Sequence, residues 1–354
     1  MLIFLICHIE GATSSFFPGI DLTVSTSIYF TQYETNNFFY NQVIFESISN
    51  KPAIIVNTKA SINLLIESSF FYNCSSYSFA GAIYIISPSI KYVMNRVCAF
   101  GCFVCTQVGG QLSYIQTSAG NETVFSYFSM ARCSPLGIDE YALSGIEQRY
   151  SLSQIKNCNI SKNRAKRFSG FCFNSIAGSI QITYSQFIDN FALDYGVINY
   201  DYSSLSLSNG YVVIKGSMYG SNNAYCVYSN SRIRFNNSVF LDNHLFLFYS
   251  ANNNYICLDN CFIKHQNYMV FTGGLISYVS CSPTYGEYLS LMFTDYYNSY
   301  LCIQDSSNQI IQMPTPFPSP SQCAIISNYY IRDFGLLPIV VSLSVLFTYD
   351  IYIL

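Results

Sequence analysis

Charge is what this sequence lacks most. Only 10% of its 354 residues are charged, with 16 Lys and Arg against 19 Asp and Glu. A soluble helical bundle needs charged outer faces, so the composition excludes one. Intrinsic disorder is excluded because the chain carries 32 Tyr and 29 Phe. The net charge of −3 gives no basic surface for a nucleic-acid partner.

Long hydrophobic runs are also scarce. A protein with several membrane spans needs several apolar runs of about 18 residues or more. One such stretch, residues 335–354, stands at the end of the chain. The remaining class is a β-rich protein whose surface is built from uncharged Ser, Asn, Thr and Tyr. The length fits one elongated domain or two compact ones.

The N-terminus predicts entry into the secretory pathway. A short apolar segment at 2–7, followed by small residues, is typical of a signal peptide over residues 1–14, with a buried first strand as the alternative. The 14 Cys fit an oxidising compartment. Four N-x-S/T sequons would carry glycans in such a protein, at Asn73, Asn121, Asn159 and Asn236.

The C-terminus predicts attachment to a membrane. Proline occupies every second position from Pro314 to Pro320, which favours an extended stalk over 312–334. Residues 335–354 are long enough for one membrane anchor, although no basic tail follows and a buried terminal strand is the alternative. We therefore expect an ectodomain over 15–311, displayed at the cell surface or plasma membrane.

A repeat runs through the ectodomain. Its template segments are SSFFYN at 68–73, SQFIDN at 185–190 and SVFLDN at 238–243, each with a large apolar residue three positions before an Asn. Looser copies give anchors 22–32 residues apart, at 45, 70, 98, 128, 160, 187, 218, 240 and 262.

Short strands flank each anchor. The strand after an anchor usually opens with a small residue, and its third residue is apolar, which predicts one inward column at Ile83, Leu112, Cys172, Ile198, Cys226, Leu247 and Ile276. The fifth residues would share that face, so Tyr200, Tyr228, Tyr249 and Tyr278 are predicted to stack internally rather than form a sugar-binding platform. Three short strands per repeat indicate an all-β parallel β-helix of about nine turns, formed by a single chain.

Two of these repeats resemble a known group. FYNC at 71–74 with AGAIYI at 80–85, and QFIDN with GVINY at 186–200, are similar to the FxxN and GGAI repeats of polymorphic outer-membrane proteins and of pectin-lyase-like surface families of parasitic protists. The resemblance covers about 45–280. It implies a right-handed β-helix displayed at a cell surface, with a role in adhesion, and it transfers no catalytic residue.

Candidate catalytic and metal-binding residues are few. Asp189 and Asp242 share a repeat position, but a turn intervenes, and we predict that they serve in bends. His244 and His265 are too few ligands for zinc. We therefore predict no catalytic, cofactor or metal site.

The cysteines offer a different pattern. Cys98, Cys102 and Cys105 have a spacing that suggests metal binding, but zinc motifs usually need two such pairs. Cys74 and Cys102 share an offset on adjacent turns. We expect a disulfide or a stacked thiol pair there, because neighbouring turns place their Cα atoms within disulfide reach.

A basic cluster is the candidate binding site. Six of the 16 basic residues fall within 149–167, and we predict glycan binding by Lys162, Arg164, Lys166 and Arg167, with a solvated turn as the alternative. The sequence thus predicts a non-enzymatic structural or adhesive surface protein. The alternatives are a carbohydrate-active lyase or hydrolase and a degenerate family member without activity.

Overall fold

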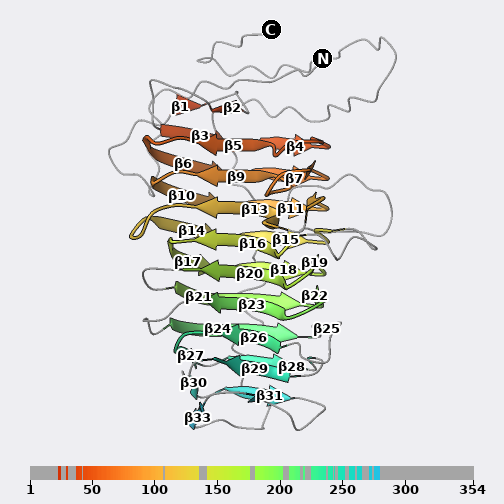
Figure 1. Ribbon diagram of the computed structural model, residues 1–354, viewed down its shortest axis with the longest axis vertical. Helices are drawn as coiled ribbons and strands as arrows, with labels where there is room; N and C mark the ends of the chain where they lie inside the picture. The colour runs from red at the N-terminus through yellow and green to blue at the C-terminus, as the bar shows by residue number, and fades with distance from the viewer. Residues whose placement is uncertain are drawn as a thin grey trace, which may run out of the picture.

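The chain folds into a parallel β-solenoid (Figure 1). The computed structural model describes 23–24, 29–30 and 37–279, except 42, 107, 135–141, 176–179, 202–206, 216–217, 220–224, 237, 242, 244–245, 252–254, 260, 265–270 and 273–274. The predicted signal peptide, stalk and membrane anchor lie outside these residues. The described part consists of strands, turns and bends, and it contains no helix long and apolar enough to cross a membrane.

Each turn contributes strands to three ladders, and every pairing in them is parallel. The first ladder comprises β1 (Thr23–Val24), β3 (Asn37–Asn41), β6 (Ser61–Glu67), β10 (Ser89–Asn95), β14 (Glu122–Ser126), β17 (Leu152–Lys156), β21 (Ile180–Ile188), β24 (Leu207–Lys215), β27 (Ile233–Asn236), β30 (Tyr255–Asp259) and β33 (Leu275–Val279). The second ladder comprises β4 (Ile44–Glu46), β7 (Phe70–Tyr72), β11 (Cys98–Phe100), β15 (Ser129–Ala131), β18 (Asn159–Ser161), β28 (Val239–Leu241) and β31 (Phe262–Lys264), and the long strands β21 and β24 serve both ladders.

The third ladder is a separate ten-stranded sheet. It comprises β2 (Tyr29–Phe30), β5 (Ile54–Asn57), β9 (Ile83–Ile86), β13 (Gly110–Gln116), β16 (Ser144–Arg149), β20 (Phe168–Asn174), β23 (Gly196–Asp201), β26 (Tyr225–Ser229), β29 (Phe246–Ser250) and β32 (Phe271–Thr272). Two small sheets bridge the second and third ladders, namely β8 (Ser75–Ser76) with β12 (Phe103–Val104), and β19 (Arg164–Ala165), β22 (Phe191–Ala192) and β25 (Met218–Tyr219).

The solenoid has about six turns rather than the nine predicted. Each turn begins with a strand of the first ladder. The strands β3, β6, β10, β14, β17 and β21 begin six turns, and the sixth turn ends with β23. The later strands β24 to β33 extend the same ladders, but several of the segments that join them lie outside the described residues. The predicted three strands per turn are confirmed, whereas the predicted number of turns is wrong.

The second ladder sets the true repeat register. One row of its positions pairs from turn to turn, at Phe45, Phe71, Ala99, Met130, Ile160, Phe187, Ile214, Phe240 and Ile263. The anchors predicted at 45, 160, 187 and 240 fall on this row, and those at 70, 98, 128, 218 and 262 do not. The error arises in SSFFYN, because Phe71, rather than Phe70, corresponds to Phe187.

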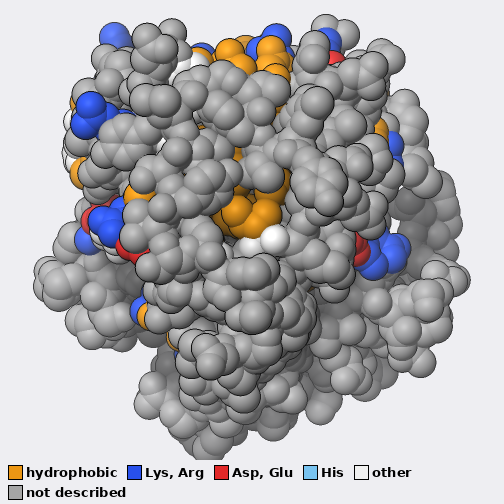
Figure 2. Space-filling view, turned by 90° about the horizontal axis from the view of Figure 1, so that it is seen from below, with side chains coloured by type: hydrophobic (Ala, Val, Ile, Leu, Met, Phe, Trp, Pro, Cys, Tyr) orange, Lys and Arg blue, Asp and Glu red, His pale blue; other side chains and the backbone are white. Residues whose placement is uncertain are grey.

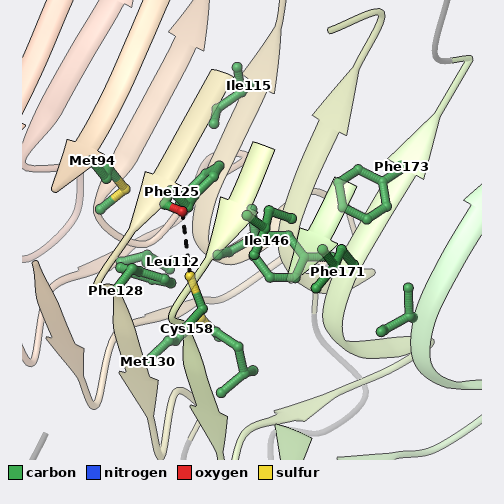
Figure 3. Packing of buried hydrophobic residues seen from close by; sticks show 14 of the residues in the cluster. Met94, Leu112, Ile115, Phe125, Phe128, Met130, Ile146, Cys158, Phe171 and Phe173 are labelled. Carbon is green, nitrogen blue, oxygen red and sulfur yellow. Dashed lines mark hydrogen bonds between the residues drawn. The ribbon is translucent and has the colours of Figure 1, made fainter. Parts of the chain in front are cut away.

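Buried aromatic and aliphatic side chains fill the solenoid. Phe45 and Phe71 stack with ring centroids 4.6 Å apart, and Phe171 and Phe173 stack at 5.4 Å. Figure 3 shows such residues from all three ladders meeting in the middle, where the Cys158 thiol donates to the Phe125 carbonyl at 3.7 Å. Burial comes from contacts between successive turns, which explains how a chain with few charges can form a core.

Two bends with left-handed backbone recur in the turns. The first bend separates the first and second ladders, at Ser68, Arg96, Tyr127, Asn157 and Tyr184. The second follows the second ladder, at Ser47, Asn73, Gly101, Arg132, Lys162 and Asp189. Asn and Asp tolerate this backbone, as predicted for Asp189. Arg, Lys and Tyr at equivalent positions indicate that packing of the turns, rather than local preference alone, imposes the bend.

The column predicted on the third ladder is buried, with Ile83, Leu112, Ile198, Cys226 and Leu247 in the core, but its register is wrong at most positions. The structure pairs Ile54, Ile83, Ser113, Ile146, Phe171, Ile198, Val227 and Phe248 in one inward row. Leu112, Cys172, Cys226 and Leu247 each lie one residue away from this row, and Ile276 belongs to β33 of the first ladder. The register shifts at Gly110/Ser113, Ser144/Ile146 and Phe168/Phe171 account for errors at the bulged strands, since one extra residue reverses the faces.

Glycine at the start of these strands has a packing reason. A Cβ at Gly170 would lie 2.7 Å from the Val197 carbonyl oxygen, and one at Gly145 would lie 2.7 Å from that of Gly170. The bulged backbones therefore approach each other too closely for a side chain. Seen from the end that carries β33, hydrophobic side chains occupy the middle of the molecule and charged ones lie toward its edge (Figure 2).

Candidate functional site

The outer face of the third ladder carries the candidate site. Strand alternation places one row of residues opposite the core, and each member pairs with the next: Tyr84, Tyr114, Glu147, Cys172, Asn199, Tyr228 and Tyr249. We call this the outer row. Its strands form one continuous column in Figure 1. Tyrosines occupy both ends of the row, and polar residues occupy its centre.

One end of the outer row is an aromatic cluster formed by Phe168, Tyr195, Tyr225, Tyr228 and Tyr249, which we call the C-terminal cluster. Tyr228 and Tyr249 stack with centroids 4.9 Å apart, and Tyr195 meets Tyr228 edge-on at 5.4 Å. Tyr225 lies 4.8 Å from Tyr249. The four tyrosines are partly exposed. Their rings combine an apolar surface with hydroxyl groups that can reach solvent.

The other end is formed by Phe79, Tyr84 and Tyr114, which we call the N-terminal cluster. Tyr84 stacks on Tyr114 at 5.7 Å, and Phe79 lies 5.3 Å from Tyr114. The Arg149 guanidinium lies over the Tyr114 ring, 5.2 Å from its centroid. Burial is the main cause that raises the pKa of Tyr114 to about 12, and the nearby Arg149 charge acts in the opposite direction. Tyr114 therefore stays neutral well beyond physiological pH.

The centre of the outer row is a polar network around Glu147. Its Oε1 atom accepts hydrogen bonds from Arg149 Nε at 2.8 Å and Asn174 Nδ2 at 3.1 Å, and Arg149 Nη2 lies 2.7 Å away. Asn199 Nδ2 donates to Asn174 Oδ1 at 3.3 Å and to Cys172 Sγ at 3.4 Å. Glu147, Cys172 and Asn199 are buried, whereas Arg149 and Asn174 are partly exposed.

The tyrosine column predicted from the sequence divides between two faces. Tyr200 is in the core and stacks on Phe173 at 5.4 Å, as predicted. Tyr228 and Tyr249 are instead on the outer row and partly exposed. Tyr278 lies on β33, where it pairs with Leu258. The internal position is thus confirmed for Tyr200 and wrong for Tyr228 and Tyr249, while the surroundings of the Tyr278 side chain lie outside what the structure describes.

The predicted basic residues are divided between neighbouring places on the solenoid. Lys162 is exposed at the second bend, and Arg164 lies over the Phe191 ring at 4.2 Å. Lys166 and Arg167 precede β20, and the Arg167 guanidinium lies 5.7 Å from the Tyr195 ring centroid. Arg167 therefore joins the C-terminal cluster.

Sequence reasoning missed Arg132, and it counted Arg149 in the basic cluster without assigning it a role. Arg132 is exposed at the second bend, on the turn before Lys162. Arg149 binds Glu147 on the outer row. Arg132 could have been found, because it occupies the same position in the second bend as Lys162. The face on which Glu147 lies could not be predicted, because the bulge before Ile146 shifts the alternation of the strand.

Cys74 and Cys102 lie on adjacent turns, as the sequence predicted. Both are buried free cysteines in the structure, where Cys74 Sγ donates to the Phe45 carbonyl at 3.4 Å and Cys102 Sγ donates to the Phe71 carbonyl at 3.7 Å. The adjacent Cys102 thiol and burial raise the pKa of Cys74 well above its ordinary value. Cys133 continues the column, and Asn163 and Asn190 follow it, with Asn163 Nδ2 donating to Asn190 Oδ1 at 3.2 Å. The structure thus has the stacked thiols, and the alternative disulfide stays a prediction.

The cysteine pattern does not form a metal site in the described part of the chain. Cys98 is disulfide-bonded, which separates it from Cys102 and Cys105. No group of three or more His, Cys, Asp or Glu that could hold a metal ion occurs among the described residues. Asp189 is exposed at the second bend, and Asp242, His244 and His265 lie outside the described residues.

The four sequons differ in how the structure presents them. Asn73 is exposed at the second bend. The Asn121 amide is occupied, since its Nδ2 donates to the Pro88 and Ser118 carbonyls at 2.8 Å. Asn159 is only 6% exposed within β18, and Asn236 is partly exposed on β27. Asn73 is the sequon best placed to carry a glycan.

No family model matches the chain, and no curated protein or solved structure matches it. The pectin-lyase-like and polymorphic outer-membrane resemblance therefore stays a prediction, and function has to be inferred from the outer row itself.

Proposed function

We propose that the chain is a non-enzymatic adhesive solenoid of the cell surface, which binds glycans through the outer face of its third ladder. The observation that carries the proposal is the C-terminal cluster, in which partly exposed Tyr195, Tyr228 and Tyr249 lie on successive turns. Tyr228 and Tyr249 cover each other's faces, so the exposed edges and hydroxyl groups of the rings form an aromatic strip along which successive sugar units can pack. A surface poor in charge suits a ligand made mainly of hydroxyl groups.

Cations beside the rings extend the range of ligands. Arg167 adjoins the C-terminal cluster, and Lys162, Arg164 and Lys166 lie on the same turn. A local basic cluster attracts acidic glycans such as sulfated or uronate chains, and its contribution falls as salt rises. We therefore assign affinity to the rings and attraction of acidic chains to the cations.

The proposed location is the outside of the cell. A signal peptide over 1–14, a stalk over 312–334 and an anchor over 335–354 would display the solenoid there. The repeat resemblance supports the same placement, as a right-handed β-helix of the pectin-lyase-like type. Surface labelling of the tagged full-length chain tests this location, and a wholly cytosolic signal would refute it.

Binding is tested on a printed array of neutral and acidic oligosaccharides. The full-length chain should bind, and a Tyr195→Ala/Tyr228→Ala double variant should lose at least about 90% of the signal, if each ring contributes on the order of 1 kcal/mol. Tyr127→Ala is the matched control, because Tyr127 is exposed at the first bend. Full binding by the double variant would refute the proposed surface.

A carbohydrate-active enzyme is the second candidate. The buried Glu147 carboxylate beside Arg149 favours it, since a carboxylate and a cation on a sugar-binding surface could serve acid–base chemistry. Incubation of the full-length chain with polyuronide decides between the two. Depolymerisation that is lost in Glu147→Gln would replace the adhesive proposal with a lyase or hydrolase.

A further inference from the structure

The polar centre of the outer row has acceptors that no donor reaches. Glu147 Oε1 is fully engaged by Arg149 and Asn174, but Glu147 Oε2 is buried and has no hydrogen-bond partner. At the other end of the network, Asn199 uses Nδ2 to reach Asn174 and Cys172, while its Oδ1 is buried without a partner. The network therefore ends in an unpaired oxygen on each side.

Unpaired buried acceptors are costly. Leaving one unsatisfied costs about 1–3 kcal/mol, and more for a charged group, so native proteins keep few of them. Glu147 is 0% exposed and Asn199 is 4% exposed. Two such atoms in one network, on the sheet face opposite the core, point to a donor that comes from outside the chain.

The surroundings limit which donor fits. The Arg149 guanidinium, 2.7 Å from Glu147, disfavours a metal ion or an ammonium group beside it. A sulfate, phosphate or uronate group is disfavoured as well, because its negative oxygens would face the Glu147 carboxylate and the Asn199 Oδ1 acceptor. Hydroxyl groups donate without carrying charge. The Tyr114 ring lies beside the network and stacks on the partly exposed Tyr84 ring. Tyr114 is 4% exposed and has the Arg149 guanidinium over its ring, so a sugar reaches this apolar surface only when Arg149 moves.

We infer that Glu147 Oε2 and Asn199 Oδ1 accept hydrogen bonds from hydroxyl groups of successive units of one neutral sugar chain, and that the unit at Glu147 packs against the Tyr114 ring. The inference rests on the proposed function, and it names neutral hexose chains as the ligand class. Arg149 lies against both Glu147 and Tyr114 and is 36% exposed, so we expect its side chain to move aside as the sugar enters.

The test measures binding of the full-length chain to cello- and manno-oligosaccharides, with uronate oligosaccharides alongside, by array and then by calorimetry. Glu147→Gln should weaken binding of the neutral oligosaccharide at least about tenfold, because an amide at 147 no longer provides two acceptors. Asn199→Ala should have a similar effect and serves as the second variant. Thermal unfolding establishes that each variant is folded.

Glu122→Gln is the matched control. Glu122 also faces a cation, Lys91 at 3.7 Å, but it is partly exposed on the first ladder. Equal affinity of wild type, Glu147→Gln and Asn199→Ala for a neutral oligosaccharide would overturn the inference and leave the proposed function standing. Binding of uronate chains alone would do the same. Absence of binding to every glycan would overturn both.

Discussion

The two faces of the third ladder are made from alternate residues of the same strands, yet they are built differently. Toward the core, Phe171 and Phe173 stack in a row of apolar side chains. On the outer row, tyrosines surround Glu147 and Asn199, whose oxygens lack partners. The inner face buries mainly apolar side chains, although Ser113 Oγ and Gln148 Nε2 there also lack partners. The outer row differs because its two unpaired acceptors belong to one charged network on the face opposite the core, and we take this network to point to a ligand.

The largest effect is expected on the inner face. Phe171→Ala should lower the free energy of unfolding by roughly 3–5 kcal/mol, because it leaves a cavity between Phe125, Phe173 and Phe187. Denaturant unfolding of the full-length chain measures the change. A loss below about 1 kcal/mol would mean that Phe171 does not face the core and that the inward register of β20 is wrong.

The next largest effect concerns the bulge in β20, between Phe168 and Phe171, which sets which residues face the core. Gly170→Ala should cost roughly 1–3 kcal/mol, since the added Cβ would meet the Val197 carbonyl oxygen on the next turn. Gly120→Ala is the comparison, because a Cβ there meets nothing within 4 Å, although its φ of +88° adds local strain. If Gly170→Ala is the milder of the two, close approach of the turns is not what selects glycine at 170.

A smaller effect on stability is expected on the outer row. Tyr228→Ala should change the free energy of unfolding by no more than about 1.5 kcal/mol, because its ring is partly exposed and contacts mainly Tyr195 and Tyr249. The same unfolding measurement on Tyr228→Ala and Phe171→Ala compares the faces directly. Equal losses would remove the distinction between them.

The smallest effect is a dependence on alkaline pH. The pKa of Tyr114 is raised to about 12 by burial, so the folded state resists its ionisation. Stability that Tyr114 contributes is complete below its ordinary pKa of about 10 and is lost as pH rises from there toward 12. Unfolding measured across pH 9–12 should fall less steeply in Tyr114→Phe than in wild type. Parallel curves would show that Tyr114 titrates normally.

Much of the fold could be predicted from the sequence. The three-strand turns and the bends at Asn73 and Asp189 follow from short apolar segments and Asx residues at a recurring interval. The register could not, because a bulge adds one residue without changing the composition and thereby reverses which face Cys172 occupies. The basic part of the site was predicted from the sequence, whereas Tyr228 and Tyr249 were assigned to the core, and the Glu147 network required the pairing of β13, β16, β20 and β23.

The most direct test of the proposed binding surface is a tyrosine footprint of the outer row. The full-length chain is nitrated with tetranitromethane, with and without an oligosaccharide selected on the array, and the modified tyrosines are mapped by mass spectrometry. We predict that Tyr228 and Tyr249 react in the free protein and are protected when the oligosaccharide is bound, while Tyr127 reacts equally in both. Protection of Tyr127 with continued reaction of Tyr228 and Tyr249 would contradict the claim that the outer face of the third ladder is the binding surface.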